Sequence, residues 1–138
     1  MSSDRFRFRH PTDVRFRDCD AMRHVNNAVY FTYLEQARLA YWQALFGTRR
    51  LEDINFILAH VECDYRLPIT LGDGVDVRLA AGSFGRSSFA FEYELADRDD
   101  GRLFATARTV QVMYDYSRGT SIPIPAELRA RIEEFERA

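Results

Sequence analysis

The stretch that decides how this chain folds is RDCDAMRHVNNAVY, residues Arg17–Tyr30. Between positions 18 and 27 it places two carboxylates, a histidine and two asparagines, directly before an apolar segment with helical spacing. Free backbone N–H groups and a partial positive charge gather where a helix begins. Such a place can hold the oxyanion that forms during acyl transfer. The stretch therefore predicts a strand-to-helix junction that carries chemistry.

The segment that follows predicts a long, buried helix from Asn27 to Phe46. Its apolar residues recur at spacings of three and four, the period of a helix face, and they are Tyr30, Tyr33, Leu34, Ala37, Tyr41, Ala44 and Leu45. At 1.5 Å per residue the helix would run about 30 Å. Asn26 or Asn27 is a candidate N-cap, and Gly47 is a natural C-terminal stop.

Strands are predicted on both sides of this helix. Before it, Phe6, Phe8, Val14 and Phe16 alternate with charged residues, and Pro11 marks a bend or the true start of the strand. After it come four candidate strands: 54–67, 75–81, 89–95 and 103–116. A parity change near Ala59–His60 predicts a bulge in the first of these. Turns are expected at 68–74, 82–86 and 97–101, and a short helix at 126–137.

The order of these elements indicates an α+β fold in which a curved antiparallel sheet wraps around the long helix. The length of 138 residues predicts a single domain, 1–138. A net charge of −2 argues against nucleic acid as a partner, and no apolar run is long enough to predict a membrane span. We expect a cytoplasmic protein, because the N-terminal segment has no apolar core of signal-peptide length. Two cysteines and three histidines in no metal-ligand spacing predict no metal site.

The motif DCDAMRHVNNAVY, residues 18–30, resembles the signature of hotdog-fold thioesterases of the 4-hydroxybenzoyl-CoA thioesterase type. Further similar segments are EQAR at 35–38, YRLP at 65–68 with LGD at 71–73, and GRSSF at 85–89. The resemblance covers about residues 5–117. It implies an acyl-CoA thioesterase with a five-stranded antiparallel sheet around the central helix. It also implies no metal or redox cofactor, and a homodimer or homotetramer with each site at a subunit interface.

The resemblance also implies roles for individual residues. Asp20 falls on the family's catalytic aspartate, a nucleophile or general base. Asn27 falls where a backbone N–H at the helix start polarises the thioester carbonyl. His24 and Glu35 complete the candidate catalytic set, Glu35 because spacings of four from Asn27 and Phe31 let it face the same cleft. The candidate substrate-binding residues are Asn26, Tyr30, Phe31, Arg86, Ser87 and Ser88, of which the last three align with a region that often meets the CoA nucleotide.

Several of these residues also have plain structural interpretations. Asp20 could be a turn residue, the two asparagines could cap the helix, and Glu35 could pair with Arg38. Asp18 is expected to be structural or solvent-facing. Arg23 stands where many relatives have glycine, so a positive φ there would strain the backbone.

Two rival functions remain open at this stage. One is a hotdog hydratase or dehydratase that acts on CoA or carrier thioesters, although the Asn-Pro and Pro-Gly elements typical of such enzymes do not lie between Asp20 and His24. The other is a domain that binds acyl-CoA without turnover. The acyl group, and CoA against an acyl-carrier protein, cannot be read from the motif.

Overall fold

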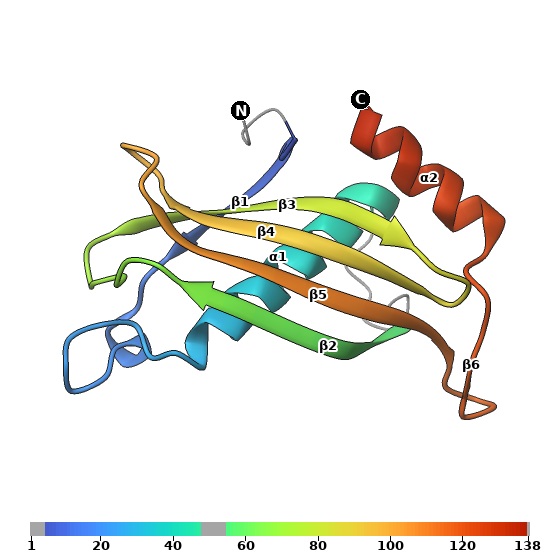
Figure 1. Cartoon of the computed structure of the whole chain (residues 1–138), viewed down its shortest axis with the longest axis horizontal. Helices are drawn as coiled ribbons and strands as arrows, with labels where there is room; N and C mark the ends of the chain where they lie inside the picture. The colour runs from blue at the N-terminus through green and yellow to red at the C-terminus, as the bar shows by residue number, and fades with distance from the viewer. Residues whose placement is uncertain (1–4, 48–54, 138) are drawn as a thin grey trace.

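The long helix α1, Val29–Phe46, lies along one face of an antiparallel sheet in a computed structural model that describes residues 5–47 and 55–137 (Figure 1). It begins two residues later than predicted, because the Asn26 side chain accepts the Ala28 N–H at 2.9 Å and fixes a turn before the first helical residue. It ends at Gly47, whose φ of 67° is the left-handed conformation that glycine adopts without strain.

The buried face of α1 confirms most of the predicted apolar stripe. Seven of its eight buried side chains are apolar or aromatic, at helical spacing: Tyr30, Tyr33, Leu34, Ala37, Tyr41, Trp42 and Leu45. Ala44, which the pattern placed with them, is exposed. The eighth buried side chain is the cation Arg38.

Five main strands form the sheet in the order β1-β3-β4-β5-β2, and every neighbouring pair is antiparallel. Their bounds are β1 Phe8–Asp13, β2 Phe56–Tyr65, β3 Gly74–Phe84, β4 Ser88–Asp97 and β5 Leu103–Asp115. A two-residue strand, β6 Thr120–Ser121, pairs with the end of β5, and α2 Ala126–Arg137 follows. The predicted α+β class, the sheet around a long helix and the C-terminal helix are confirmed.

Some local predictions need correction. Pro11 lies inside β1, which tolerates it because β1 is an edge strand. The alternation stops at Asp13, and Phe16 enters a short 3₁₀ helix, η2 Phe16–Asp18, where it is 83% exposed. β3 continues through Gly82 to Phe84. The bulge at Ala59 is confirmed, because the register with β5 shifts between Leu58 and His60. Ile54, the predicted start of β2, lies outside the described residues.

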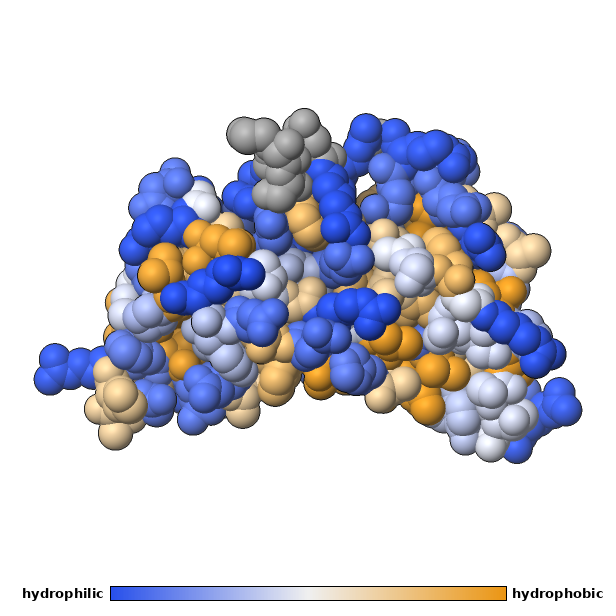
Figure 2. Space-filling model, in the orientation of Figure 1, coloured by the Kyte–Doolittle hydropathy of each residue, from blue (hydrophilic) through white to orange (hydrophobic). Residues whose placement is uncertain are grey.

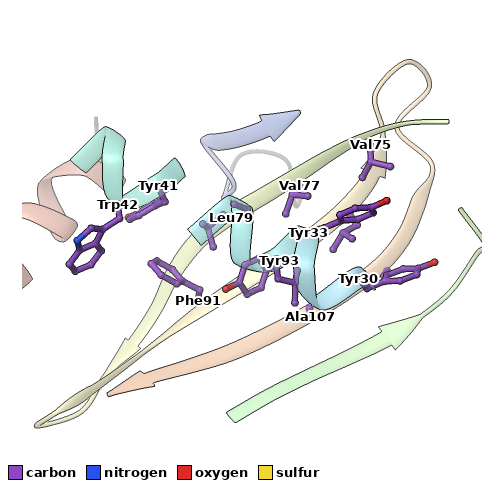
Figure 3. Packing of buried hydrophobic residues seen from close by; sticks show 14 of the residues in the cluster. Tyr30, Tyr33, Tyr41, Trp42, Val75, Val77, Leu79, Phe91, Tyr93 and Ala107 are labelled. Carbon is purple, nitrogen blue, oxygen red and sulfur yellow. The ribbon is translucent and has the colours of Figure 1, made fainter. Parts of the chain in front are cut away.

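The core between α1 and the sheet is strongly aromatic (Figure 3). The ring of Phe91 on β4 lies 4.9 Å from that of Tyr41 on α1 and 5.3 Å from that of Phe89. Helix α2 closes one end of this core: Phe135 packs against Tyr41, whose hydroxyl donates to Glu136 at 2.6 Å. On the face shown in Figure 2, hydrophobic and hydrophilic side chains are interspersed in small patches. No described helix meets the length and hydropathy that a membrane crossing requires.

Candidate active site

Residues 19–25, in the middle of the motif, fold into a tight hairpin ahead of α1. Cys19 and Val25 pair as antiparallel residues, and Asp20 closes the turn by donating its N–H to the His24 carbonyl at 2.8 Å. The Arg23 N–H donates to the Asp20 carbonyl at 3.0 Å. Arg23 itself has φ 68° and is the left-handed residue that ends the three-residue hairpin loop 21–23. The backbone thus fixes Asp20 at the start of the turn.

Arg23 is the only described non-glycine residue with a positive φ. We expect Arg23→Gly to raise the free energy of unfolding by about 0.5–1 kcal/mol, because glycine adopts this conformation without a Cβ clash. Urea unfolding measures the change. Arg17→Gly is the matched control, since the described φ at Arg17 is not positive and the substitution should give no gain. Equal or opposite shifts for the two variants would contradict strain at Arg23.

Asp20 and His24 line a cleft of about 700 Å³. Its other walls are Phe16, Cys19, Met22, Arg23, Thr70 and Leu71. Phe16, Met22 and Leu71 are 83%, 73% and 53% exposed, so large apolar side chains surround the two polar ones. Thr70 lies at the cleft because it pairs with His24 of the hairpin as an antiparallel bridge. An apolar hollow with a few convergent polar groups is the usual form of a small-molecule site.

The Asp20 carboxylate is exposed and accepts one hydrogen bond among the described residues, from the Met22 N–H to Oδ1 at 2.9 Å. This bond makes Asp20 a turn residue, as the structural interpretation held, but it leaves Oδ2 available to a ligand.

The Asp18 carboxylate, in contrast, has a structural role. Its Oδ2 accepts the Arg15 N–H at 2.9 Å and the Tyr33 hydroxyl at 2.7 Å, so it anchors η2 to α1. Burial and the Asp18 hydrogen bond raise the pKa of Tyr33, which keeps that hydroxyl a donor.

The start of α1 offers a second polar feature. Asn27 is exposed, and its carbonyl accepts the Tyr65 hydroxyl at 3.0 Å. Within residues 5–47 and 55–137 its N–H donates to no other group. Asn26 is exposed as well, and its side chain accepts the Ala28 N–H in the turn that precedes the helix. The N-cap is Ala28, which has no side-chain capping bond, so the prediction that Asn26 or Asn27 caps the helix is wrong. Neither asparagine lines the cleft that holds Asp20, so their assignment to the reaction stays a prediction.

Three predicted residues along α1 lie elsewhere. Tyr30 is 3% exposed and packs edge-on against Tyr65 at 4.8 Å, so it belongs to the core rather than to a ligand surface. Phe31 is 38% exposed.

Glu35 does not share the cleft of Asp20 within one chain. It lines a second pocket, of about 480 Å³, with Arg38, Leu39, Phe56, Ile57, Leu58 and Tyr116. Among the described residues Glu35 forms no ion pair with Arg38, so that interpretation is also wrong.

Arg86 and Ser87 form the turn between β3 and β4, and Ser88 is the first residue of β4. The Gly85 N–H closes the turn by donating to the Ser88 carbonyl at 2.7 Å. The Asp20 cleft lies beside Thr70, close to the start of β3, whereas this turn follows its end. At ~3.3 Å per residue the ten steps of β3 span roughly 33 Å. Asp20 and Arg86 of one chain therefore lie at opposite ends of the sheet, and one ligand could meet both only across two subunits.

The structure adds residues that the motif did not predict. Thr70 and Leu71 join the cleft through long-range pairing with the hairpin, and Arg38 is a buried cation beside the second pocket. Cys63 is not a candidate nucleophile, because burial raises the pKa of its thiol to about 11 and keeps it protonated at neutral pH. The described residues contain no cluster of three or more histidine, cysteine or acidic side chains that could hold a metal ion.

Comparisons with known proteins agree with this architecture. The model of the thioesterase-like superfamily matches residues 14–132. A thioesterase from Thermus thermophilus, solved with coenzyme A and zinc, is 38% identical, covers 97% of this chain and 98% of its own, and superposes with a TM-score of 0.86. The long-chain acyl-CoA thioesterase FadM of Escherichia coli is 26% identical over 88% of this chain and 94% of its own length. The 1,4-dihydroxy-2-naphthoyl-CoA thioesterase Slr0204 of Synechocystis, at 21% identity and a TM-score of 0.82, shares the fold over 94% of this chain and 97% of its own.

The fold and the hairpin-and-helix site thus define a hotdog-type thioesterase architecture. The chain belongs to the thioesterase-like superfamily.

Proposed function

We propose that this protein hydrolyses acyl-CoA thioesters to a carboxylic acid and free CoA. The observation that carries the proposal is the Asp20 carboxylate, held by the hairpin at the wall of a large apolar cleft with one oxygen uncommitted. The similarity to a thioesterase solved with coenzyme A and to a long-chain acyl-CoA thioesterase supports the same reaction class.

In this mechanism Asp20 attacks the thioester carbonyl or takes a proton from a water that attacks it. The carbonyl carbon gains an oxygen, the C–S bond breaks, and the sulfur leaves as a thiolate that takes up a proton. If Asp20 is the attacking group, a water then hydrolyses the acyl-aspartate and restores the carboxylate. His24, beside Asp20 in the same cleft, is available to orient the water or the sulfur.

The oxyanion would be stabilised at the start of α1. There the exposed Asn27 N–H and the first turn of an 18-residue helix supply donors and a partial positive charge. The mechanism uses no metal or redox cofactor, because a carboxylate and backbone donors suffice for attack and charge stabilisation. The substrate is CoA-linked in this proposal, and an acyl-carrier thioester is the alternative that the assay below includes.

We further propose that the working form is a homodimer built on β2, which a tetramer would extend. β2 is an edge strand, and Ile57 and Leu58 on it are 37% and 44% exposed. An uncovered apolar edge invites pairing with another chain, whereas the opposite edge, β1, carries Pro11 and Arg9. Light scattering should give at least twice the mass of one chain, and Ile57→Arg should shift the protein to the single-chain mass. A monomeric parent protein would refute this assembly.

The thiol state of the protein supports a cytoplasmic location. Cys19 and Cys63 are both free, and free thiols persist in reducing compartments.

A thiol-release assay over acyl-CoAs of different length and ring content, together with one acyl-carrier thioester, tests the proposed reaction. We expect thiol to appear from at least one acyl-CoA. Hydration of an enoyl-CoA without thiol release would identify a hydratase instead. Saturable binding of acyl-CoA with no turnover would identify a binding domain.

A further inference from the structure

Arg23 has a backbone conformation that its residue type disfavours, and it has it at the wall of the Asp20 cleft. Its φ of 68° is the only positive value at a described residue other than glycine. In this region the Cβ of an L-residue comes too close to the backbone, whereas glycine has no Cβ to clash. Strained residues of this kind gather at binding and catalytic sites, where the strain is retained for function. The turn alone would be best served by glycine, so the Arg23 side chain points to a further role.

The charges at the cleft indicate what that side chain supplies. Among the lining residues Asp20 carries a negative charge and Arg23 a permanent positive one. Both residues are exposed. No described group accepts a hydrogen bond from the Arg23 guanidinium or forms an ion pair with it, so the guanidinium is available to a ligand. A carboxylate alone would repel an anionic substrate, and the arginine offsets that repulsion.

The hairpin fixes Arg23 relative to the residue proposed to react. The Arg23 N–H donates to the Asp20 carbonyl at 3.0 Å, and the Met22 N–H donates to Asp20 Oδ1 at 2.9 Å. The loop is therefore tied to Asp20 at both positions, and the base of the Arg23 side chain stays close to it. Two other exposed arginines of this region, Arg15 and Arg17, line a different pocket. Arg23 is thus the arginine placed to meet a ligand that Asp20 attacks.

The substrate of the proposed reaction has an apolar and an anionic part. An acyl-CoA carries an acyl group on a pantetheine arm, and phosphates follow at the other end of the arm. Phe16, Met22 and Leu71 offer apolar surface in the cleft. Arginine suits a phosphate, because its planar fork gives two parallel N–H donors to the phosphate oxygens. Its long side chain can also place the charge away from the reacting carboxylate.

We propose that Arg23 is a specificity-determining residue, which binds the CoA phosphate nearest to the thioester, and that the backbone strain is retained for this contact. The inference rests on the proposed thioester hydrolysis and adds a residue that recognises the thiol part of the substrate. A phosphate so far from the reacting carbon is bound equally in the ground state and the transition state. The contact should therefore lower KM and leave kcat unchanged.

Thioesters with a progressively shortened thiol part test the proposal. The acyl group that the parent protein hydrolyses fastest is presented as its CoA, phosphopantetheine and pantetheine thioesters, with Arg23→Gly and Arg23→Lys beside the parent. We expect Arg23→Gly to raise KM about tenfold for the two thioesters that carry the phosphate, through the loss of a charge-assisted contact. KM for the pantetheine thioester, which has no phosphate, should not change. Arg23→Lys should keep part of the affinity, since it keeps the charge and loses the planar fork.

Arg17→Gly is the matched control, because it removes the same charge from an exposed residue that does not line the cleft. Its KM values should stay within about twofold of those of the parent, since salt screens charges that make no contact. Equal increases in KM for Arg17→Gly and Arg23→Gly would overturn the proposal, because general surface charge would then explain them. An equal increase for the pantetheine thioester would also overturn it, since Arg23 would then act on the arm, the acyl group or Asp20.

Stability gives a second measurement on the same proteins. Arg23→Gly should unfold at a higher urea concentration than the parent while it binds acyl-CoA more weakly, because it loses the strain together with the contact. A merely structural Arg23 would not produce this combination. If KM for acyl-CoA is unchanged in Arg23→Gly, the proposal is rejected and thioester hydrolysis is unaffected.

A failure of the proposed function would be recognised separately. If no acyl-CoA is hydrolysed, calorimetry with CoA itself tests Arg23 without turnover. We then expect CoA to bind the parent about tenfold more tightly than Arg23→Gly, and Arg17→Gly to bind it as the parent does. Equal Kd values for the parent and Arg23→Gly would reject the phosphate contact.

Discussion

Asp20→Asn is expected to lower kcat/KM for thioester hydrolysis by about 100-fold or more, because the amide can neither attack the carbonyl nor take a proton from water. The substitution is nearly isosteric. The Asn side-chain oxygen can still accept the Met22 N–H that Asp20 accepts at 2.9 Å, so the turn should persist. Stopped assays with a thiol reagent measure the rate, and the unfolding midpoint shows whether the fold is unchanged.

Glu134→Gln is the matched control for this variant. Glu134 is an exposed acid on α2, and its substitution removes the same charge without touching the cleft. It should retain the parent rate. If Asp20→Asn hydrolyses acyl-CoA as fast as Glu134→Gln, the carboxylate takes no part in the reaction, although the fold and the superfamily would be unaffected.

The features that sequence predicted well are those set by local spacing. The stripe on α1 follows from helical periodicity, and the bulge at Ala59 follows from a change of parity within one strand. The positive φ at Arg23 was anticipated in a different way, from the resemblance, because many relatives have glycine at this position.

The features that sequence missed depend on contacts between distant parts of the chain. Thr70 lies at the cleft because it pairs with His24, which is 46 positions earlier in the chain. No local sequence pattern predicts that pairing. Glu35 does share a helix face with Phe31. The packing of α1 against β2 decides which pocket that face lines. Glu35 lines the second pocket, whereas the spacing had pointed to the cleft of Asp20.

Phe16 shows how a correct pattern can mislead. Its alternation with charged residues is real, yet the chain leaves β1 after Asp13 and turns into η2, which exposes the ring at the cleft. The alternation predicted burial, whereas the residue forms part of an open apolar wall. Exposed large apolar side chains of this kind mark ligand or partner surfaces.

Phe91→Ala is expected to reduce the free energy of unfolding by about 3–5 kcal/mol, the usual cost of removing a fully buried aromatic ring. Phe91 is fully buried at the centre of the aromatic core, with ring centroids at 4.9 Å from Tyr41, 5.3 Å from Phe89 and 6.4 Å from Tyr93. A cavity there would separate α1 from β4, which are two rigid elements that cannot collapse around it. Since small domains have about 5–15 kcal/mol in total, the loss is a large share.

Phe46→Ala serves as the comparison, because the same ring is removed where it is 39% exposed. Its loss should stay near ~1 kcal/mol, since the site already opens to water and leaves no closed cavity. Urea unfolding of both variants against the parent gives the two values. If Phe91→Ala costs no more than Phe46→Ala, the aromatic core does not hold α1 to the sheet. A large difference would show that the packing of Phe91 between α1 and β4 is a main source of the stability of the domain.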